Sequence, residues 1–438
     1  MGLKEKLSQL NRFINQSNKK SPFFRSIFQI ILSFIFLVEK QIRLFKEWLK
    51  FGKLYFKNTY WIDTEKIQYL SGLKSKKWRD IYRIIGGDWD KSKRRFEDLL
   101  LYQAFKQKFT EGKKWEDTEY YKTNLEIILK GLDKWGYNDK GDLDRRIKFI
   151  EDLYYKIKTE GFKSNRELIS TKNLISRLDI HELLDNIAVD IGRNGQILIR
   201  HGKNRLSIAK LLNISEIPVT IIARHKEWMD LRRNLRKYLK VYQTRRKIQI
   251  LNHPDLQNIP FKQGGNFFDI IRKNTSIFKG TLLEMEAQLG FFSIKFEDDG
   301  FECYAQESNP IYLKLLKKLK TAENKKFNII AESIYDYIKA HKVDFDIIIA
   351  INFLNKYLKD KENFHDLVNF FKNVKVKELF IEFPNPKKVR ESKAFRNYDT
   401  NRLIDIIIEN SCLNKATFLS KTNYKSYIYK LTANNFSP

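Results

Sequence analysis

The chain has 438 residues, enough for two or three domains, because a single hydrophobic core stops growing well below that length. Lysine and arginine number 83 against 53 aspartates and glutamates, so the formal net charge is +30 at pH 7. This excludes the near-neutral balance of an ordinary cytosolic enzyme and favours an anionic partner: a nucleotide, nucleic acid, an acidic glycan or an anionic lipid. A genome rich in A and T, which raises the lysine content without any such partner, remains the alternative explanation.

The cysteines and histidines indicate neither a disulfide framework nor a metal site. There are two cysteines, Cys303 and Cys412, and six histidines, and none of them form a pair at metal-ligand spacing. We therefore expect a reduced, cytoplasmic setting and no bound metal.

Residues 1–60 are predicted to be a basic, amphipathic and apolar helical segment. Its most apolar stretch runs from Phe23 to Val38, but only Ser26 to Val38 is free of charge, short of the roughly 20 residues that a spanning helix needs. Phenylalanine and leucine then alternate with lysine and arginine up to Phe56. Two interpretations stay open: association with a membrane surface through Phe23 to Phe56, or a helix packed on protein.

Residues 61–178 have a mostly helical pattern, broken at Gly86-Gly87 and resumed from Arg94 to Phe109. An aromatic and acidic cluster follows Gly112, from Trp115 to Tyr121. It is interpreted either as a helix N-cap followed by a packed helix, or as the lining of a binding cleft.

Residues 179–230 change to a strand pattern. A hairpin is predicted around Arg193 to Gly195, then a helix from Leu206 to Leu212 and a strand from Ile217 to Ile222. A glycine followed by basic residues opens the helix, a pattern typical of anion binding because free backbone N–H groups point at the ligand. The candidate phosphate-binding residues are Gly202, Lys203, Asn204 and Arg205.

This segment resembles the core of the ParB/sulfiredoxin-like superfamily through Gly202, Arg205 and the Ile217-Pro218-Val219 strand. His201 stands where that superfamily usually has an aspartate, and Asn204 where it usually has histidine or arginine. The resemblance implies an α+β domain that binds a nucleotide or phosphate, without the acid that phosphoryl transfer would use. Residues 231–262 follow as a basic helical linker, because Leu231 to Lys247 carries eight basic residues and no acid.

Residues 263–438 are predicted to form a parallel, doubly wound α/β sheet. An apolar run from Thr281 to Leu283 ends in Glu284, a turn carries Gly290, and a second run ends in Glu307, 23 positions after Glu284. Doubly wound sheets hold ribose hydroxyls with an acid at about this distance. Further strands are expected at the ranges 327–331, 345–351, 378–383, 417–420 and 427–431, with a helix at 401–410.

The phrase around Glu284 resembles the first loop of class I S-adenosylmethionine (SAM)-dependent methyltransferases, which reads acid, any residue, Gly, three residues, Gly. Here Glu286 replaces the first glycine. The resemblance implies a Rossmann-like sheet with SAM as cofactor, bound by Glu284, Glu286, Gly290, Glu307 and Glu332. It assigns no catalytic residue.

The methyl acceptor is not identified by the resemblance. The segment from Asn352 to Tyr357 has neither an Asn-Pro-Pro-Tyr motif nor a cysteine, which favours a hydroxyl or carboxyl acceptor over a nucleobase. Two functions stay open. One is a SAM-dependent methyltransferase with a ParB-like anion-binding module; the other is a non-catalytic nucleotide- or nucleic-acid-binding protein with a degenerate methyltransferase fold. The fold class expected is multidomain α/β with a helical N-terminal region.

Overall fold

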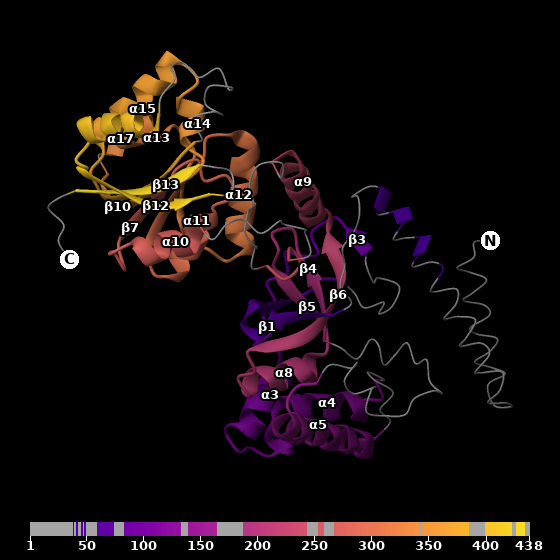
Figure 1. Cartoon of the computed structure of the whole chain (residues 1–438). Helices are drawn as coiled ribbons and strands as arrows, with labels where there is room; N and C mark the ends of the chain where they lie inside the picture. The colour runs from indigo at the N-terminus through magenta and orange to yellow at the C-terminus, as the bar shows by residue number, and fades with distance from the viewer. Residues whose placement is uncertain are drawn as a thin grey trace. The chain divides into compact units, whose positions relative to one another are not determined.

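The computed structural model of the chain describes residues 59–73, 83–132, 139–163, 187–242, 253–257, 267–341, 343–384, 399–422 and 426–433, with single positions between 38 and 49. The chain divides into two compact units, Met1–Met229 (unit 1) and Asp230–Pro438 (unit 2), drawn in Figure 1.

Unit 1 is built on a mixed sheet whose order is β1-β6-β4-β5-β2, with β3 pairing along β6. Its strands are β1 (Tyr60–Asp63), β2 (Ile67–Leu70), β3 (Arg83–Ile85), β4 (Ile187–Ile191), β5 (Ile197–His201) and β6 (Glu216–His225). The predicted hairpin is confirmed: β4 and β5 pair antiparallel around a turn in which Gly195 has φ +83°. The predicted strand from Ile217 is also confirmed, as part of β6.

Four helices among the described residues pack together beside this sheet around an apolar core of their own. They are α3 (Leu100–Phe109), α4 (Glu119–Leu129), α5 (Lys140–Glu160) and α8 (Lys203–Leu211). Phe105 of α3, Ile150 of α5 and Ile208 of α8 belong to one buried cluster. The helix predicted from Leu206 is therefore confirmed, and it starts three residues earlier.

The prediction that residues 61–178 are helical is wrong at their beginning, where β1, β2 and β3 lie. β1 and β2 have four residues each and flank a 3-10 turn (Thr64–Lys66), so neither is long enough to show a clear alternation. Their partners β6 and β5 come more than a hundred residues later. The helix expected from Arg94 begins at Leu100, because Leu70 N–H donates to the Arg94 carbonyl at 2.9 Å and holds that segment beside β2.

The aromatic and acidic cluster is an N-cap followed by a packed helix, the first of its two interpretations. Thr118 caps α4, and its hydroxyl oxygen accepts the Tyr121 N–H at 3.2 Å. Trp115 is buried, and its indole N–H donates to a Glu151 carboxylate oxygen at 3.0 Å. The cluster therefore stabilises the helical layer.

Unit 2 contains a seven-stranded sheet of order β12-β13-β11-β10-β7-β8-β9. The strands are β7 (Thr281–Glu284), β8 (Glu302–Gln306), β9 (Asn328–Ile330), β10 (Phe345–Ala350), β11 (Val376–Phe383), β12 (Lys415–Lys421) and β13 (Tyr427–Thr432). The first five run parallel, and β13 is antiparallel to β11. The strands predicted in this part of the chain are confirmed.

Helices lie on both faces of this sheet, as in a doubly wound fold (Figure 1). One layer contains α10 (Phe267–Asn274), α11 (Phe291–Asp298) and α12 (Pro310–Ala322); the other contains α13 (Ile334–His341), α14 (Leu354–Tyr357), α15 (Lys361–Asn373) and α17 (Thr400–Glu409). Alternate residues of β10 serve the two layers: Ile347 and Ile349 pack with the first, Ile348 and Ala350 with the second. From Ile347 to Ala350 β10 is apolar, as is typical of a strand buried on both faces, and for this reason its sequence predicted it well.

The helix α9 (Lys226–Tyr242) runs through the start of the predicted basic linker. The helical prediction is confirmed as far as Tyr242, and the remainder lies outside the described residues. Arg232 of α9 forms a buried ion pair with Asp255, Nη1 to Oδ2 at 2.7 Å. The backbone N–H of His253 donates to Glu323 next to α12 at 2.7 Å. These contacts hold residues 253–257 between α9 and the end of α12.

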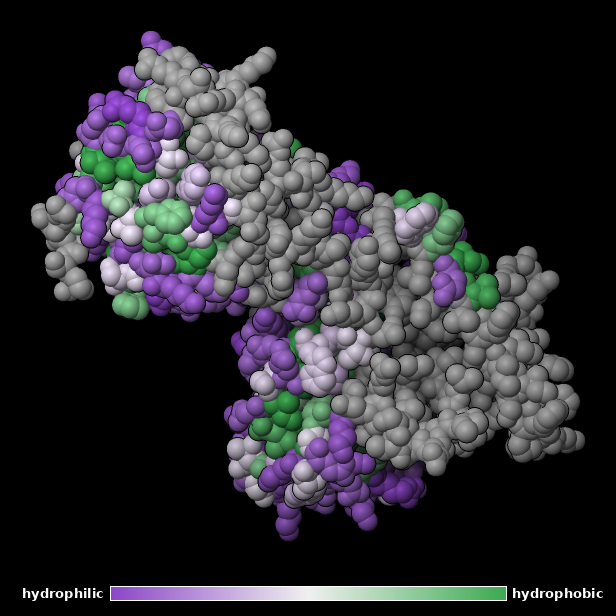
Figure 2. All heavy atoms as spheres, in the orientation of Figure 1, coloured by the Kyte–Doolittle hydropathy of each residue, from purple (hydrophilic) through white to green (hydrophobic). Residues whose placement is uncertain are grey.

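Most of the segment from Phe23 to Phe56, for which contact with a membrane surface and packing on protein were both open, lies outside the described residues. Its described positions are helical, and their exposed apolar side chains are Val38, Ile42, Phe45, Trp48 and Leu49. Figure 2 shows green, apolar surface at the described positions of this segment, which Figure 1 draws as short indigo pieces. Among the described residues, no helix is both long and apolar enough to cross a bilayer.

Candidate functional site

The loop between β7 and α11 has a backbone conformation that favours glycine at three alternate positions. Glu286 has φ +50°, Gln288 +53° and Gly290 +72°. Only Gly290 is the residue type that takes this conformation at no steric cost, and each of the others costs on the order of 1 kcal/mol. The loop is held by Ala287 N–H donating to the Gln306 carbonyl at 2.8 Å. The second of these positions, Gln288, was missed by sequence reasoning.

Glu284 lies beneath this loop and caps the helix that follows it. Its carboxylate accepts the Phe292 N–H at 3.1 Å, the Ser293 N–H at 2.8 Å and the Ser293 hydroxyl at 2.6 Å. Burial raises the pKa of Glu284 to about 7, and the bonds from Ser293 and Phe292 limit that rise. The residue therefore positions the loop by satisfying the N-terminal amides of α11.

Gly290 allows α11 to approach α12 closely. It is the N-cap of α11, and a Cβ atom placed on it would lie 2.5 Å from the Cδ1 atom of Leu316. The predicted glycine is thus required both by its φ angle and by packing.

Glu307 follows β8 and is fully buried. Its carboxylate accepts the Gln288 N–H at 2.9 Å and the Asn309 N–H at 2.7 Å. Burial is the largest cause of its raised pKa, and the charge of Glu286 adds to it. Glu307 therefore connects the loop after β7 with the loop after β8.

Glu286 reaches across to the segment after β10. Its Oε1 atom lies 2.6 Å from Lys356 Nζ and 3.5 Å from the Tyr357 hydroxyl. The Glu286 side chain is 16% exposed and that of Lys356 46%. Burial raises the pKa values of Tyr335 and Tyr357, which stay neutral phenols at physiological pH. Lys356 and Tyr357 were not predicted as site residues.

Glu332 lies beyond β9 with its side chain exposed. Its carbonyl accepts the Gln306 Nε2–H at 3.0 Å, while Gln306 Oε1 accepts the Glu286 N–H at 3.2 Å. Gln306 therefore links the segments of Glu286 and Glu332. Its position just before Glu307 was the only sequence signal for it.

Helix α9 contacts the same loop. The Tyr238 hydroxyl donates to Gln288 Oε1, and its ring packs edge-on against Tyr312 of α12 with centroids 5.0 Å apart. Tyr238 is buried. This tyrosine was not predicted, because nothing in a basic helix indicates which face meets the loop.

The predicted phosphate-binding residues of unit 1 surround the start of α8. Gly202 is its N-cap with φ +85°, and a Cβ there would lie 2.9 Å from Ile187 Cα. Lys203 and Asn204 are half-buried at the first two helical positions. The pKa of Lys203 is lowered by burial first and by the charge of Arg94 second.

Arg205 already has contacts within unit 1. It donates through Nη2 to the Lys163 carbonyl at 2.6 Å, and its guanidinium lies 4.5 Å from the centre of the Phe162 ring. The arginine therefore ties α8 to the end of α5. Lys203 is the better candidate for an anion contact.

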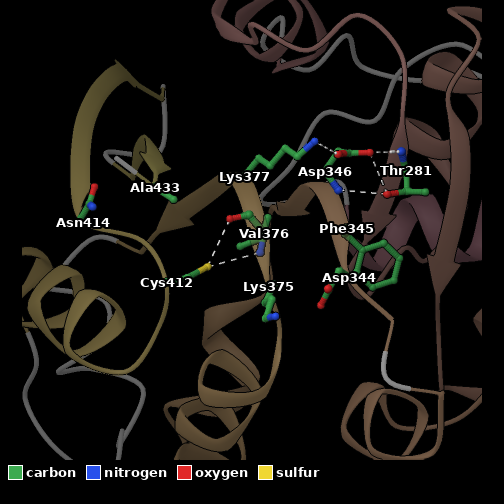
Figure 3. Close-up of a pocket in the computed structure, with 10 residues that line it drawn as sticks. All are labelled: Thr281, Asp344, Phe345, Asp346, Lys375, Val376, Lys377, Cys412, Asn414 and Ala433. Carbon is green, nitrogen blue, oxygen red and sulfur yellow. Dashed lines mark hydrogen bonds and ion pairs between the residues drawn. The ribbon is translucent and has the colours of Figure 1, made fainter. Parts of the chain in front are cut away.

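A cavity of about 590 Å³ opens at the opposite end of the strands of the seven-stranded sheet from the loop that carries Glu286 (Figure 3). It lies at the amino ends of β10 and β11, where Lys377 Nζ is 2.7 Å from Asp346 Oδ1. Cys412 also lines it and hydrogen-bonds to the Val376 backbone. None of the predicted site residues line it, and ligands of doubly wound sheets bind at the carboxyl ends of the strands.

Comparisons with known proteins give structural likeness only. No protein-family model and no curated protein match the chain. Among solved structures, the chain is similar to the PH0226 protein of Pyrococcus horikoshii. The two sequences are 13% identical, the match covers 45% of this chain and 99% of the other, and the TM-score is 0.34. It is similar to the N-methyltransferase NodS of Bradyrhizobium japonicum, with 14% identity, 38% of this chain, 93% of the other and a TM-score of 0.31.

A third similar structure is the magnesium protoporphyrin IX methyltransferase ChlM of Synechocystis with bound SAM, with 11% identity, 47% of this chain, 98% of the other and a TM-score of 0.32. With TM-scores below 0.5, these likenesses carry no argument about the site. What the structure itself establishes is a mixed α/β chain with two sheets, of which the second is doubly wound.

Proposed function

We propose that unit 2 is a SAM-dependent methyltransferase domain. The observation that carries this proposal is the loop from Glu284 to Gly290, with left-handed backbone at alternate positions. It follows β7, which lies beside β10 where the strand order reverses. Loops at this topological switch point form the ligand crevice of doubly wound sheets.

The residues present fit such a cofactor in part. Glu307 follows the neighbouring strand, as an acid for ribose hydroxyls would, and Glu332 follows the next one, on the side proposed for the adenine. Two backbone N–H groups use two of the about four lone-pair sites of Glu307, so acceptors remain for hydroxyls. Because Glu307 is buried, a ligand has to displace the side chains that cover it.

SAM supplies a methyl group activated on a sulfonium. The protein's part is to align an acceptor with that methyl, which is catalysis by proximity. We assign no catalytic base: Tyr335 and Tyr357 lie near Glu286, and their raised pKa values keep them protonated. Their hydroxyl groups would position the methyl acceptor. We propose that this acceptor is a hydroxyl or carboxyl group.

Equilibrium dialysis of the full chain with labelled SAM tests the proposal. We expect saturable binding below millimolar cofactor, and no binding at millimolar SAM would remove the proposal. The variant Glu286→Gly restores the glycine of the methyltransferase loop. If only that variant binds, the natural chain is the non-catalytic protein of the alternative hypothesis.

A second function, anion binding by unit 1, is favoured by Lys203. It stands in the first turn of α8 within electrostatic reach of Arg94, and no carboxylate pairs with it among the described residues. A phosphate group would relieve this repulsion and meet the free N–H groups of the helix. The ParB-like resemblance supports the same ligand class.

Binding of nucleotides and of short DNA and RNA to the full chain tests this second function, at low and at physiological salt. We expect affinity that falls steeply with salt and that Lys203→Met weakens. The matched control is Lys210→Met, because Lys210 sits at the other end of α8 and pairs with Glu65 at 3.4 Å. Affinity that is independent of salt and equal in both variants would contradict it.

A further inference from the structure

The ion pair between Glu286 and Lys356 joins two loops at the topological switch point. Glu286 belongs to the loop after β7 and Lys356 to α14 after β10, and these two strands are neighbours. α11 and α14 lie on opposite faces of the sheet, so the two loops lead away from the carboxyl ends of their strands in different directions. The 2.6 Å contact of Oε1 with Nζ therefore connects the segments that follow β7 and β10.

One member of this pair, Glu286, is held in a backbone conformation that costs free energy. Glu286 keeps the left-handed backbone conformation, φ +50°, although it has a side chain. Its backbone N–H is held by Gln306 Oε1 at 3.2 Å, and its carboxylate also lies 3.5 Å from the Tyr357 hydroxyl. The loop after β7 thus supplies one carboxylate at the switch point, and α14 places one ammonium beside it.

The charges of this pair extend to the rest of the site. Both Glu286 and Lys356 shift the pKa of Glu307, the first raising it and the second lowering it. The charges of both members of the pair therefore reach Glu307. Partly exposed ion pairs contribute little stability, so a ligand can open this one at low cost.

We infer that Glu286 and Lys356 form a subsite for an α-amino-acid zwitterion, namely the methionyl end of the cofactor. Glu286 takes the α-ammonium and Lys356 takes the α-carboxylate, so both charges of the opened pair find a new partner. Charge-assisted hydrogen bonds of this kind are the strong ones. The inference rests on the proposed function. It makes Glu286 a ligand-binding residue, so that the replacement of the first glycine of the methyltransferase loop is a gain of a contact.

The test compares two nucleosides on the full chain by calorimetric titration. S-adenosylhomocysteine carries the amino-acid zwitterion, whereas 5′-methylthioadenosine has the same adenosine and thioether without it. The variants are Lys356→Met and the nearly isosteric Glu286→Gln. The control is Lys359→Met, an exposed lysine three positions later.

We expect the wild type to bind S-adenosylhomocysteine at least about tenfold more tightly than methylthioadenosine. Both variants should remove that preference by weakening only the first ligand, and the control should keep it. Equal effects on both ligands, or none, would overturn the inference while leaving the proposed function standing. If the wild type binds neither nucleoside, both fall. Circular dichroism of each variant establishes that the fold is kept.

Discussion

Glu284 and Ser293 are joined twice, because one carboxylate oxygen accepts both the backbone N–H and the hydroxyl of the serine, at 2.8 and 2.6 Å. The serine is in the first turns of α11 and fully buried. A strand end and a helix start are thereby fixed to each other, and this contact sets the loop that carries Glu286.

The stability of unit 2 should fall as the pH rises from about 4.5 to about 7. Burial raises the pKa of Glu284 from 4.5 to about 7, so in this interval the folded chain holds a proton that the unfolded chain has lost. Folding is thus favoured below the unfolded pKa, and this contribution is lost as the pH passes the folded pKa. The linkage amounts to about 3 kcal/mol. Urea unfolding of the wild type and of Glu284→Gln across this interval measures it. The glutamine variant should lose the contribution of Glu284 and keep that of Glu307, whose pKa burial also raises. An unchanged slope would contradict the assignment.

Gly290→Ala should destabilise unit 2 by about 1–3 kcal/mol, because the new Cβ meets Leu316 at 2.5 Å in a backbone conformation that alanine disfavours. Gly300→Ala is its matched control. Gly300 also has positive φ, +88°, but a Cβ there meets nothing within 4 Å. The difference between the two variants in the free energy of unfolding, measured with urea, gives the cost of the contact between the new Cβ and Leu316. Equal destabilisation would show that α11 and α12 are less tightly packed than the contact implies.

Gly202→Ala should destabilise unit 1 by roughly 1–3 kcal/mol, since its Cβ would lie 2.9 Å from the Ile187 backbone. Gly161→Ala has a similar φ, +77°, in open space, and should cost less. Tryptophan fluorescence follows this unfolding selectively, because all seven tryptophans precede residue 229. Identical unfolding midpoints for the two variants would count against a close approach of α8 to β4.

Tyr238→Phe should loosen α9 from the loop between β7 and α11 while its ring stays packed on Tyr312. The loss is that of one hydrogen bond to the half-buried amide of Gln288, about 1–2 kcal/mol. Hydrogen exchange should become faster in α9 and at residues 286–290. Tyr304→Phe, whose hydroxyl bonds to Glu302 at 2.6 Å at the surface, should leave both segments unchanged. Unchanged exchange in α9 would refute the contact as an anchor.

The strands of unit 2 were predictable and those at the start of unit 1 were not. β10 and β11 are largely buried on both faces, and each contains an apolar stretch, Ile347–Ala350 and Leu379–Ile381, that stands out from the helices between them. β1 and β2 are short, and they exist because β6 and β5 pair with them from far along the chain. A pairing between distant segments leaves no periodic signal at the shorter partner.

The sequence by itself determined the strand and helix succession of unit 2, the acids Glu284 and Glu307 at the ends of two strands, and the departure from glycine at Glu286. These depend on local composition and spacing. Only the tertiary structure decided that Gln288 shares the left-handed conformation, that Arg205 is held by the end of α5, and that Lys356 neutralises Glu286. The contact between Lys356 and Glu286 joins two residues that are 70 positions apart in the sequence. They follow neighbouring parallel strands, and these strands become neighbours only when the sheet assembles.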